Sequence, residues 1–351
     1  RKSWINMEDR SYRHLLERAA EHYPSRTETL EIIRGALDNA ANRELLFEAA
    51  RNVRRNTCGD QFRLTGGISS VLPCRLAPLC LYCPYWRSPE AQQASTDEIV
   101  AAVHHFKREG IREFHLSGGT IPGSDGSELL SIVQAIWNSG IRDMEITINC
   151  GAALNVETMR RMKKMGVVKT GVVFETADRE LFKSMKPGDS FSAKEKFAWD
   201  INEAGLQMHS GLMAGLGQEE SRPENYTDSL IYLRQFPHMQ SLYISKFRPD
   251  PSIPLKNKEQ CPLDEACVLV SAARLVLRDK EIRIAAGWNP QERVSGILAG
   301  GGNELCAMML NHHAAYWKPG DTAENYESRL EISDSRSEQR AMIDKMGLEI
   351  Q

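Results

Sequence analysis

The feature that most constrains the fold is a regular alternation of short apolar segments with amphipathic segments from Phe62 onward. Such alternation is typical of β/α units around a parallel sheet. The apolar segments predict eight strands, near residues 62–70, 112–117, 143–149, 167–174, 206–213, 240–247, 282–287 and 304–308. The segments between them predict helices, clearest at 96–109, 155–165, 194–204, 223–235 and 263–279. Eight strands over roughly 250 residues predict an α/β fold of the (β/α)8 TIM-type barrel class, with an open doubly wound sheet as the alternative.

The chain divides into three regions. Residues 1–60 carry helical periodicity, with Ser25 and Thr27 as candidate caps, and predict an N-terminal helical extension. Residues 61–310 contain the predicted barrel, and residues 311–351 form a C-terminal extension.

Composition and charge exclude several classes of partner. The formal net charge is −3, with 44 basic and 47 acidic residues, whereas binding to a nucleic-acid backbone calls for a basic surface. No apolar run approaches the ~20 residues that span a bilayer, and the start of the chain has no signal-peptide core. We therefore expect a cytoplasmic protein without nucleic-acid or membrane partners, whose eight cysteines are kept reduced.

Three cysteines occur within ten residues, in the arrangement C-x5-C-x2-C formed by Cys74, Cys80 and Cys83. Neighbouring prolines indicate an ordered loop. Three thiolates can hold three irons of a [4Fe-4S] cluster and leave the fourth open to a non-protein ligand. Structural zinc would need a fourth ligand, and the nearest candidates, His104 and His105, lie in a helix-like segment. Buried thiols without metal better describe the isolated cysteines, which are Cys58, Cys150, Cys261, Cys267 and Cys306.

The cysteine loop follows the first predicted strand, so it emerges at that strand's carboxyl end. Reactive groups of (β/α)8 barrels sit at this end. Segments rich in glycine and polar residues lie at the same end of other predicted strands, at 116–120, 174–178 and 211–217. Glycine lets the backbone approach a ligand closely, so these segments are candidates for the rest of the site.

Together these residues resemble the radical S-adenosylmethionine (radical SAM) superfamily, in which a three-cysteine [4Fe-4S] cluster binds SAM at its open iron. The similarity is greatest to the subgroup of biotin synthase, HydE and PylB, through the stretches 175–182 (ETADRELF) and 186–191 (KPGDSF). That subgroup usually has C-x3-C-x2-C. The five-residue first gap resembles HmdB, an enzyme implicated in building the iron-guanylylpyridinol cofactor of [Fe]-hydrogenase.

The resemblance assigns roles to individual residues. Cys74, Cys80 and Cys83 would ligate a single cluster. The residues that would bind SAM are Tyr82, Ser117, Gly118, Gly119, Thr120, Glu175, Lys194 and Met213. Lys194 stands where close relatives have an arginine against the SAM carboxylate, and lysine keeps the charge but loses the bidentate fork. For Tyr82 and Met213, simple packing is the alternative.

The resemblance also implies a mechanism, in which reductive cleavage of SAM gives a 5′-deoxyadenosyl radical that abstracts hydrogen from a substrate. Alternation along the predicted strands gives eight substrate-binding candidates, Ser69, His115, Thr147, Asn149, His209, Tyr243, Ser245 and Arg248. Each is as consistent with hydrogen-bonded packing, although Arg248 could clamp a carboxylate. For the adjacent His312 and His313, we favour exposure to solvent or a helix cap over metal binding.

We therefore expect a radical SAM enzyme that acts on a small molecule in cofactor biosynthesis in an anaerobic cytoplasm, with an electron donor such as ferredoxin or flavodoxin. The first expected role is in biosynthesis of the iron-guanylylpyridinol cofactor, and the second is that of an amino-acid mutase resembling methylornithine synthase. The alternative of another class is a non-catalytic iron–sulfur or zinc-binding module.

Overall fold

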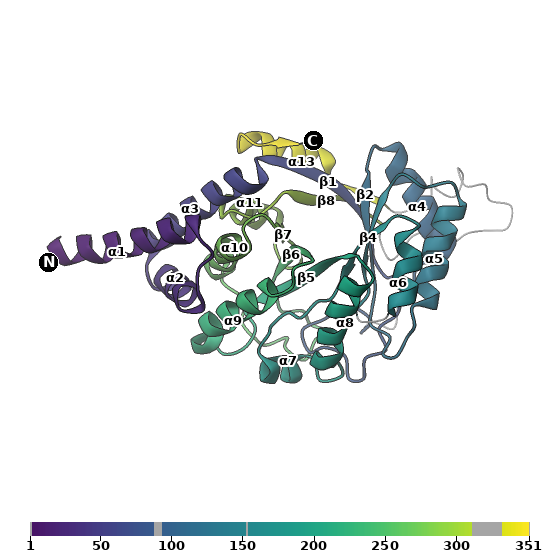
Figure 1. Cartoon of the computed structure of the whole chain (residues 1–351), viewed down its shortest axis with the longest axis horizontal. Coiled ribbons are helices and arrows are strands. Elements are labelled where there is room, and N and C mark those ends of the chain that lie inside the picture. Colours follow the sequence, from purple (N-terminus) through teal and green to yellow (C-terminus); the bar gives the residue numbers. More distant parts are fainter. Residues whose placement is uncertain (1, 88–92, 152–153, 311–331, 351) are drawn as a thin grey trace.

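Eight parallel strands form the centre of the computed structural model, which describes residues 2–87, 93–151, 154–310 and 332–350 (Figure 1). Hydrogen-bonded neighbours follow the order β7-β6-β5-β4-β3-β2-β1-β8. The strands are β1 (Gln61–Ile68), β2 (Glu113–Ser117), β3 (Glu145–Asn149), β4 (Val167–Gly171), β5 (Gln207–Ala214), β6 (Met239–Lys246), β7 (Glu281–Ile284) and β8 (Glu304–Leu310). Each lies within a few residues of its predicted position.

The strand order is that of a (β/α)8 barrel, as predicted, with an opening in its ladder. Among the described residues β7 and β8 share no strand pairing. They are joined instead by a hydrogen bond from the Gly302 amide to the Ile282 carbonyl (2.6 Å) and by an ion pair between Arg283 and Glu304 (2.9 Å).

Helices connect successive strands and cover the outside of the barrel (Figure 1). They are α4 (Thr96–Arg108), α5 (Ser127–Asn138), α6 (Val156–Lys163), α7 (Arg179–Met185), α8 (Phe191–Glu203), α9 (Arg222–Arg234), α10 (Leu263–Leu277) and α11 (Pro290–Leu298). Side-chain caps fix several starts, because Ser95 and Glu98 form a capping box on α4 and Asp178 accepts two amide hydrogens at the start of α7. The most clearly predicted helices are thus confirmed, and α5, α7 and α11 occupy intervals where the periodicity is weaker.

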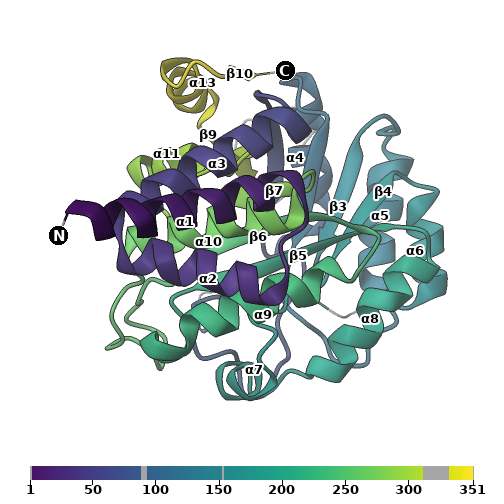
Figure 2. The same ribbon diagram turned by 60° about the vertical axis from the view of Figure 1, so that its left-hand side comes forward.

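Three helices precede the barrel, α1 (Lys2–Glu21), α2 (Arg26–Asp38) and α3 (Ala40–Cys58). They lie side by side against the barrel helices, with α3 on α10 and α2 on α9 (Figure 2). Ser25 caps α2 as predicted, whereas Thr27 lies inside that helix. Salt bridges from Arg26 to Asp228 and from Arg34 to Glu224 connect α2 to α9.

The last described residues return to the barrel. Strand β9 (Ile332–Asp334) pairs antiparallel with β8, helix α13 (Arg336–Lys345) follows, and β10 (Glu349–Ile350) pairs with β1. The pair His312 and His313 lies outside the described residues.

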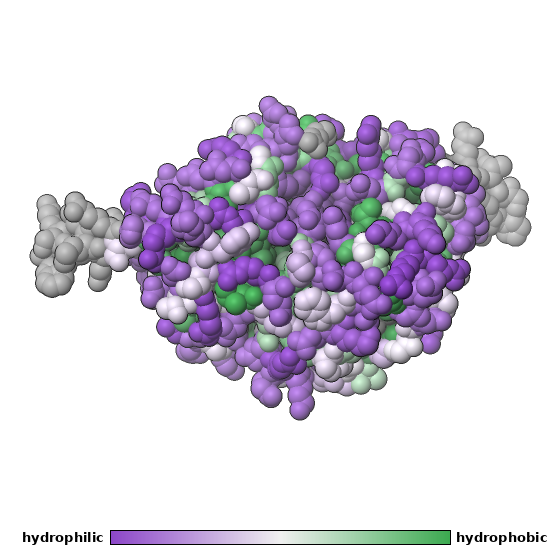
Figure 3. All heavy atoms as spheres, in the orientation of Figure 1, coloured by the Kyte–Doolittle hydropathy of each residue, from purple (hydrophilic) through white to green (hydrophobic). Residues whose placement is uncertain are grey.

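The surface in the view of Figure 3 is mostly hydrophilic, with scattered apolar patches. Large apolar side chains that are clearly exposed, Tyr23, Tyr85, Trp199 and Leu298, come from separate parts of the chain. No helix in the described part of the chain has the length and apolar character needed to span a bilayer.

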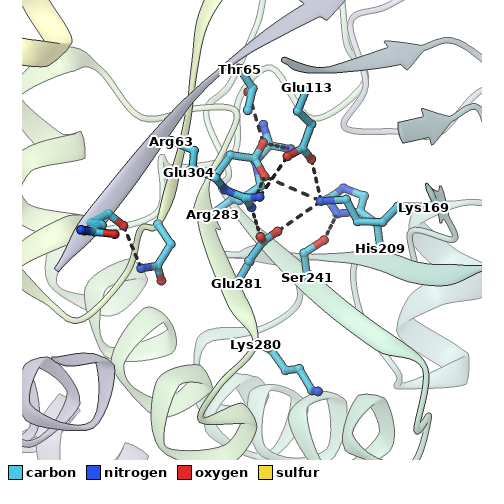
Figure 4. A network of polar contacts seen from close by, with 12 residues as sticks. Arg63, Thr65, Glu113, Lys169, His209, Ser241, Lys280, Glu281, Arg283 and Glu304 are labelled. Atoms are coloured by element: carbon cyan, nitrogen blue, oxygen red, sulfur yellow. Dashed lines mark hydrogen bonds and ion pairs between the residues drawn. The ribbon is translucent and has the colours of Figure 1, made fainter. Parts of the chain in front are cut away.

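The amino-terminal end of the barrel interior is closed by a network of charges (Figure 4). Lys169 on β4 lies 2.7 Å from Glu113 on β2 and 3.3 Å from Glu281 on β7. These strands are not sheet neighbours, so the side chains can meet only inside the barrel. Arg63 and Arg283 pair with the same acidic group of residues, which Glu304 completes. Three cations face three carboxylates, so each charge of this network has a partner, as burial requires.

Candidate functional site

The cysteine loop follows β1 and is fastened on two sides. On one side it pairs with the segment after β2, through Val71 N to Ser117 O (3.0 Å), Gly119 N to Leu72 O (2.9 Å) and Arg75 N to Thr120 O (2.9 Å). On the other side the Leu81 amide donates to the Met185 carbonyl at the end of α7 (2.9 Å). The loop is therefore held by backbone contacts to the segment after β2 and to the end of α7.

Two glycines make these contacts possible because a side chain would not fit. A Cβ atom added to Gly119 would lie 2.2 Å from Cys74 Cα, and one added to Gly188 would lie 2.2 Å from the Pro78 carbonyl oxygen. Real Cβ atoms do not approach backbone this closely. The need for a bare backbone on each side of the loop explains glycine at both positions.

An arginine holds the second half of the loop. The Arg87 guanidinium donates to the carbonyl oxygens of Cys83 (2.8 Å), Cys80 (2.6 Å) and Leu79 (3.4 Å). Burial raises the pKa of the Cys80 thiol, and it raises that of Cys83 to about 12. Without a metal, burial thus favours the protonated thiols. Coordination to a metal ion would favour the thiolates instead, because it deprotonates a thiol.

The three cysteines suit an iron–sulfur cluster better than zinc. No three His, Cys, Asp or Glu side chains within the described ranges converge on a single metal position. Structural zinc takes four ligands at one centre, and this loop supplies three thiols. A [4Fe-4S] cluster places each cysteine on a different iron, so the three sulfurs need only surround it.

Glu175 follows β4 with its backbone held in an uncommon conformation. Its φ angle is +67°, a region that costs most residues about 1–2 kcal/mol. The Glu175 amide donates to Gly211 O (2.9 Å), and the Met213 amide donates to Glu175 O (3.1 Å). The strained residue is therefore tied to β5, as is common for residues at functional sites.

The Glu175 carboxylate is buried beside the cysteine loop. Burial raises its pKa, while Lys186, Lys194 and a hydrogen bond from Tyr82 oppose that shift. Its Oε2 atom is buried and has no hydrogen-bond partner among the described residues. Buried polar atoms are nearly always paired, so this oxygen fits a ligand that donates a hydrogen bond.

Two buried lysines lie on the same side of the site. Lys186 ends α7 and Lys194 lies in the first turn of α8, and their Nζ atoms are 3.3 and 3.2 Å from Asp189 Oδ2. Burial, followed by repulsion from Lys186, lowers the pKa of Lys194 to about 8. Although burial alone would raise it, the two lysines hold the pKa of Asp189 below its ordinary value.

The structure brings most of the expected SAM-binding residues around the cysteine loop. Residues 117–120 border one side, and Gly118 donates to Asn149 O (3.1 Å) on the next strand. The Tyr82 hydroxyl lies close to the Glu175 carboxylate, and burial raises the pKa of that hydroxyl. Met213 is half-buried at the carboxyl end of β5.

Four of the substrate candidates line the barrel interior. The rings of His209 and Tyr243 lie 4.6 Å apart, and His209 Nδ1 is 2.7 Å from Ser241 Oγ. Tyr243 also lies close to Asn149. Burial, then the nearby Arg283, lowers the pKa of His115 to about 3 and that of His209 far below its ordinary value. Both imidazoles are therefore neutral at pH 7.

Two buried atoms in this interior, His115 Nδ1 and Thr147 Oγ1, have no hydrogen-bond partner in the part of the chain that the structure describes. These residues are register partners on β2 and β3, so their side chains point to the same face of the sheet. Two further candidates differ from these. Ser245 is buried on β6, whereas Arg248 lies two residues beyond that strand and is exposed.

Sequence reasoning gave no role to Lys186, Asp189 or Arg87. The first two belong to the quoted stretch KPGDSF, so the signal was present, but their convergence with Lys194 depends on the turn before α8. Nothing in the local sequence around Arg87 indicates that its guanidinium turns back onto the cysteine loop.

Comparison with known proteins identifies the family. The sequence model of the Radical SAM superfamily matches residues 73–230, beginning immediately before Cys74. These residues form a radical SAM domain. It is 25% identical over 283 residues to the [FeFe] hydrogenase maturase subunit HydE of Thermotoga maritima, covering 79% of this chain and 76% of that protein. It is 26% identical to a biotin synthase of Clostridium botulinum, covering 70% of this chain and 77% of the relative.

A solved structure has the same fold. The crystal structure of methylornithine synthase (PylB) superposes with a TM-score of 0.73 at 19% identity, covering 96% of this chain and 97% of the other. The expected subgroup is therefore confirmed, and this radical SAM protein is an enzyme. Its cofactors are a [4Fe-4S] cluster and SAM, which the cysteine trio and the unpartnered Glu175 oxygen fit. Enzymes of this superfamily act on small molecules and need a reductant.

Proposed function

We propose that this enzyme cleaves SAM reductively at a [4Fe-4S] cluster held by Cys74, Cys80 and Cys83, and that the resulting 5′-deoxyadenosyl radical abstracts hydrogen from a small polar substrate. One observation carries the proposal. The three-cysteine loop is clamped between the connections after β2 and α7, directly beside a buried carboxylate oxygen without a partner.

The chain's own residues would bind and orient SAM. We propose that the Glu175 carboxylate accepts a hydrogen bond from a SAM donor while Tyr82 holds it in place. Residues 117–120 offer backbone carbonyls and two hydroxyls to the SAM amino group. Lys194 provides positive charge for the SAM carboxylate, and Met213 lies beside the adenine. Residues 117–120, Glu175 and Met213 lie at or just after strand ends, which favours precise positioning.

The barrel interior below this site would receive the substrate. His115, Asn149, His209 and Tyr243 offer neutral hydrogen-bonding groups there, and Ser245 stands nearby on β6. In the charge network that closes the amino-terminal end of the barrel, each described cation is paired with a carboxylate. We therefore propose a substrate recognised by neutral hydrogen bonds rather than by a free cationic clamp, with Arg248 acting at most at the mouth.

We further propose a role in cofactor biosynthesis, and the iron-guanylylpyridinol cofactor of [Fe]-hydrogenase as the product pathway. The C-x5-C-x2-C spacing supports this assignment. Related proteins support the general role, because one is named as a hydrogenase maturase and another as biotin synthase. The proposal includes ferredoxin or flavodoxin as the electron donor, an anaerobic cytoplasm as the location, and a division into an extension at 1–60, a barrel at 61–310 and an extension at 311–351.

Anaerobic reconstitution tests the proposed function. The protein is loaded with iron and sulfide, reduced with dithionite and incubated with SAM, and 5′-deoxyadenosine is measured. We expect its formation in the wild type and in Cys267→Ala, which removes a buried thiol of α10, but not in Cys80→Ala. An intact [4Fe-4S] cluster that leaves SAM uncleaved would refute the proposal.

A further inference from the structure

The two lysines beside the cysteine loop have donors to spare. Each ammonium group carries three N–H donors. In the described residues, Asp189 is the one partner of Lys194 Nζ, and Lys186 Nζ adds the Val173 carbonyl oxygen (3.1 Å). Lys194 is only 2% exposed, so water does not readily reach its remaining donors. Buried polar groups are rarely left this way in the ligand-bound state of a protein.

The turn between α7 and α8 builds this arrangement. Lys186, Pro187, Gly188 and Asp189 form a turn closed by a hydrogen bond from the Asp189 amide to the Lys186 carbonyl (2.9 Å). Gly188 of this turn packs against the Pro78 carbonyl. The turn that carries Lys186 and Asp189 therefore contacts the cysteine loop directly.

The positive charges of the two lysines lie apart from the negative charge of Glu175. Two lysines share one aspartate oxygen, which leaves one uncompensated positive charge. Both lysines are among the charges that act on Glu175 and on Cys80, yet no ion pair joins either lysine to Glu175 within the described part of the chain. A positive and a negative group held apart beside the cluster loop complement a zwitterion such as the amino-acid end of SAM.

We propose that Lys186 and Lys194 together bind the SAM carboxylate, with Asp189 holding both ammonium groups in position. The assignment rests on the proposed function, and it extends the role of Lys194 to a pair. One arginine offers a carboxylate two parallel donors. A single lysine cannot do so, but two lysines fixed on a common oxygen can offer one donor each. The pair thus supplies the two contacts that are lost where relatives have an arginine.

A purely structural role for Lys186 is the competing explanation, because it also donates to Val173 O. A ligand that lacks only the carboxylate separates the two. We would measure the dissociation constants of SAM and of decarboxylated SAM by equilibrium dialysis against the anaerobic, cluster-loaded protein. The variants are Lys186→Met and Lys194→Met. The matched control is Lys183→Met, which changes an exposed lysine of the same helix.

We expect each buried-lysine variant to weaken SAM binding about tenfold or more, the usual loss for a charged hydrogen bond. Decarboxylated SAM should bind to both variants as to the wild type, Lys183→Met should change neither constant, and Lys186→Arg should restore SAM binding. Should Lys186→Met lose the cluster, Lys186→Gln is measured in its place, because its amide can still donate to Val173 O.

Three results would overturn the lysine pair. One is unchanged SAM affinity in the Lys186 variant. Another is an equal loss of affinity for SAM and for decarboxylated SAM in a variant that keeps its cluster. The third is loss of the cluster from both neutral variants, since Lys186 would then serve the cluster rather than SAM. A cluster-loaded wild type that binds no SAM would instead refute the proposed function itself.

Discussion

Replacing Gly119 with alanine should remove the cluster while leaving the fold intact. The new methyl group would lie 2.2 Å from Cys74 Cα and 2.3 Å from Cys74 N. Non-bonded carbon atoms normally sit about 3.5–4.0 Å apart, so the cysteine loop would have to retreat by more than about 1 Å. Overpacking of this kind typically costs about 1–3 kcal/mol.

A displacement of this size matters more for the cluster than for stability. Functional side chains must be held within about 0.5 Å of their working positions, and Cys74 is one of only three proposed ligands. We expect Gly119→Ala to fold and to retain little iron. The measurements are iron and sulfide content, visible absorption of the reconstituted protein, and thermal unfolding.

Gly140→Ala is the matched control. Gly140 follows α5 at a φ of +95°, and a Cβ atom there would meet nothing within 4 Å. Alanine in this conformation costs about 1–2 kcal/mol, a loss similar to that expected at Gly119 but away from the cysteines. We expect this variant to load a full cluster. A full [4Fe-4S] cluster in Gly119→Ala would refute the proposed geometry of the loop.

Three further predictions concern single side chains. Cys80→Ala should lose the [4Fe-4S] absorption, and a full spectrum in that variant would be incompatible with the ligand assignment. Glu175→Gln should keep the cluster but weaken SAM binding roughly 10- to 100-fold, the loss expected for a charged hydrogen bond, and dialysis that finds unchanged affinity would argue against its role. Burial, and then repulsion from Arg283, lowers the pKa of His115 in the folded state to about 3. Between pH 6.5 and 3 the imidazole is therefore protonated in the unfolded chain but not in the folded protein, so the free energy of unfolding decreases as the pH is lowered. Lowering the pH from 6.5 to 5 should cost about 2 kcal/mol of stability through this residue. Thermal unfolding should therefore show a smaller loss of stability over this range in His115→Asn than in the wild type. An equal loss in both proteins would mean that the imidazole is also protonated in the folded state.

Much of the fold could be predicted from local sequence pattern. Strand and helix positions follow from apolar periodicity, because each barrel strand is buried on both faces and each helix on one. The opening between β7 and β8 could not be predicted. It depends on how far β7, which ends at Ile284, overlaps its neighbour, and strand pairing of this kind leaves no local signal.

The candidate site was predictable where its residues are consecutive and unpredictable where they converge in space. The cysteine spacing and the Ser117–Thr120 run are local patterns. The contacts of Lys186 with Asp189 and of Arg87 with the cysteine loop arise from turns, and the charged floor arises from strands far apart in the sequence. Alternation also selected Arg248, but it lies past the end of β6, where alternation no longer determines the direction of a side chain.

Mössbauer spectroscopy of protein reconstituted with ⁵⁷Fe tests the central claim most directly, because it distinguishes individual irons of a cluster. We predict a [4Fe-4S] cluster in which SAM changes the signal of one iron and leaves the other three, held by Cys74, Cys80 and Cys83, unchanged. Zinc in oxygen-protected protein, or four irons that do not respond to SAM, would contradict it.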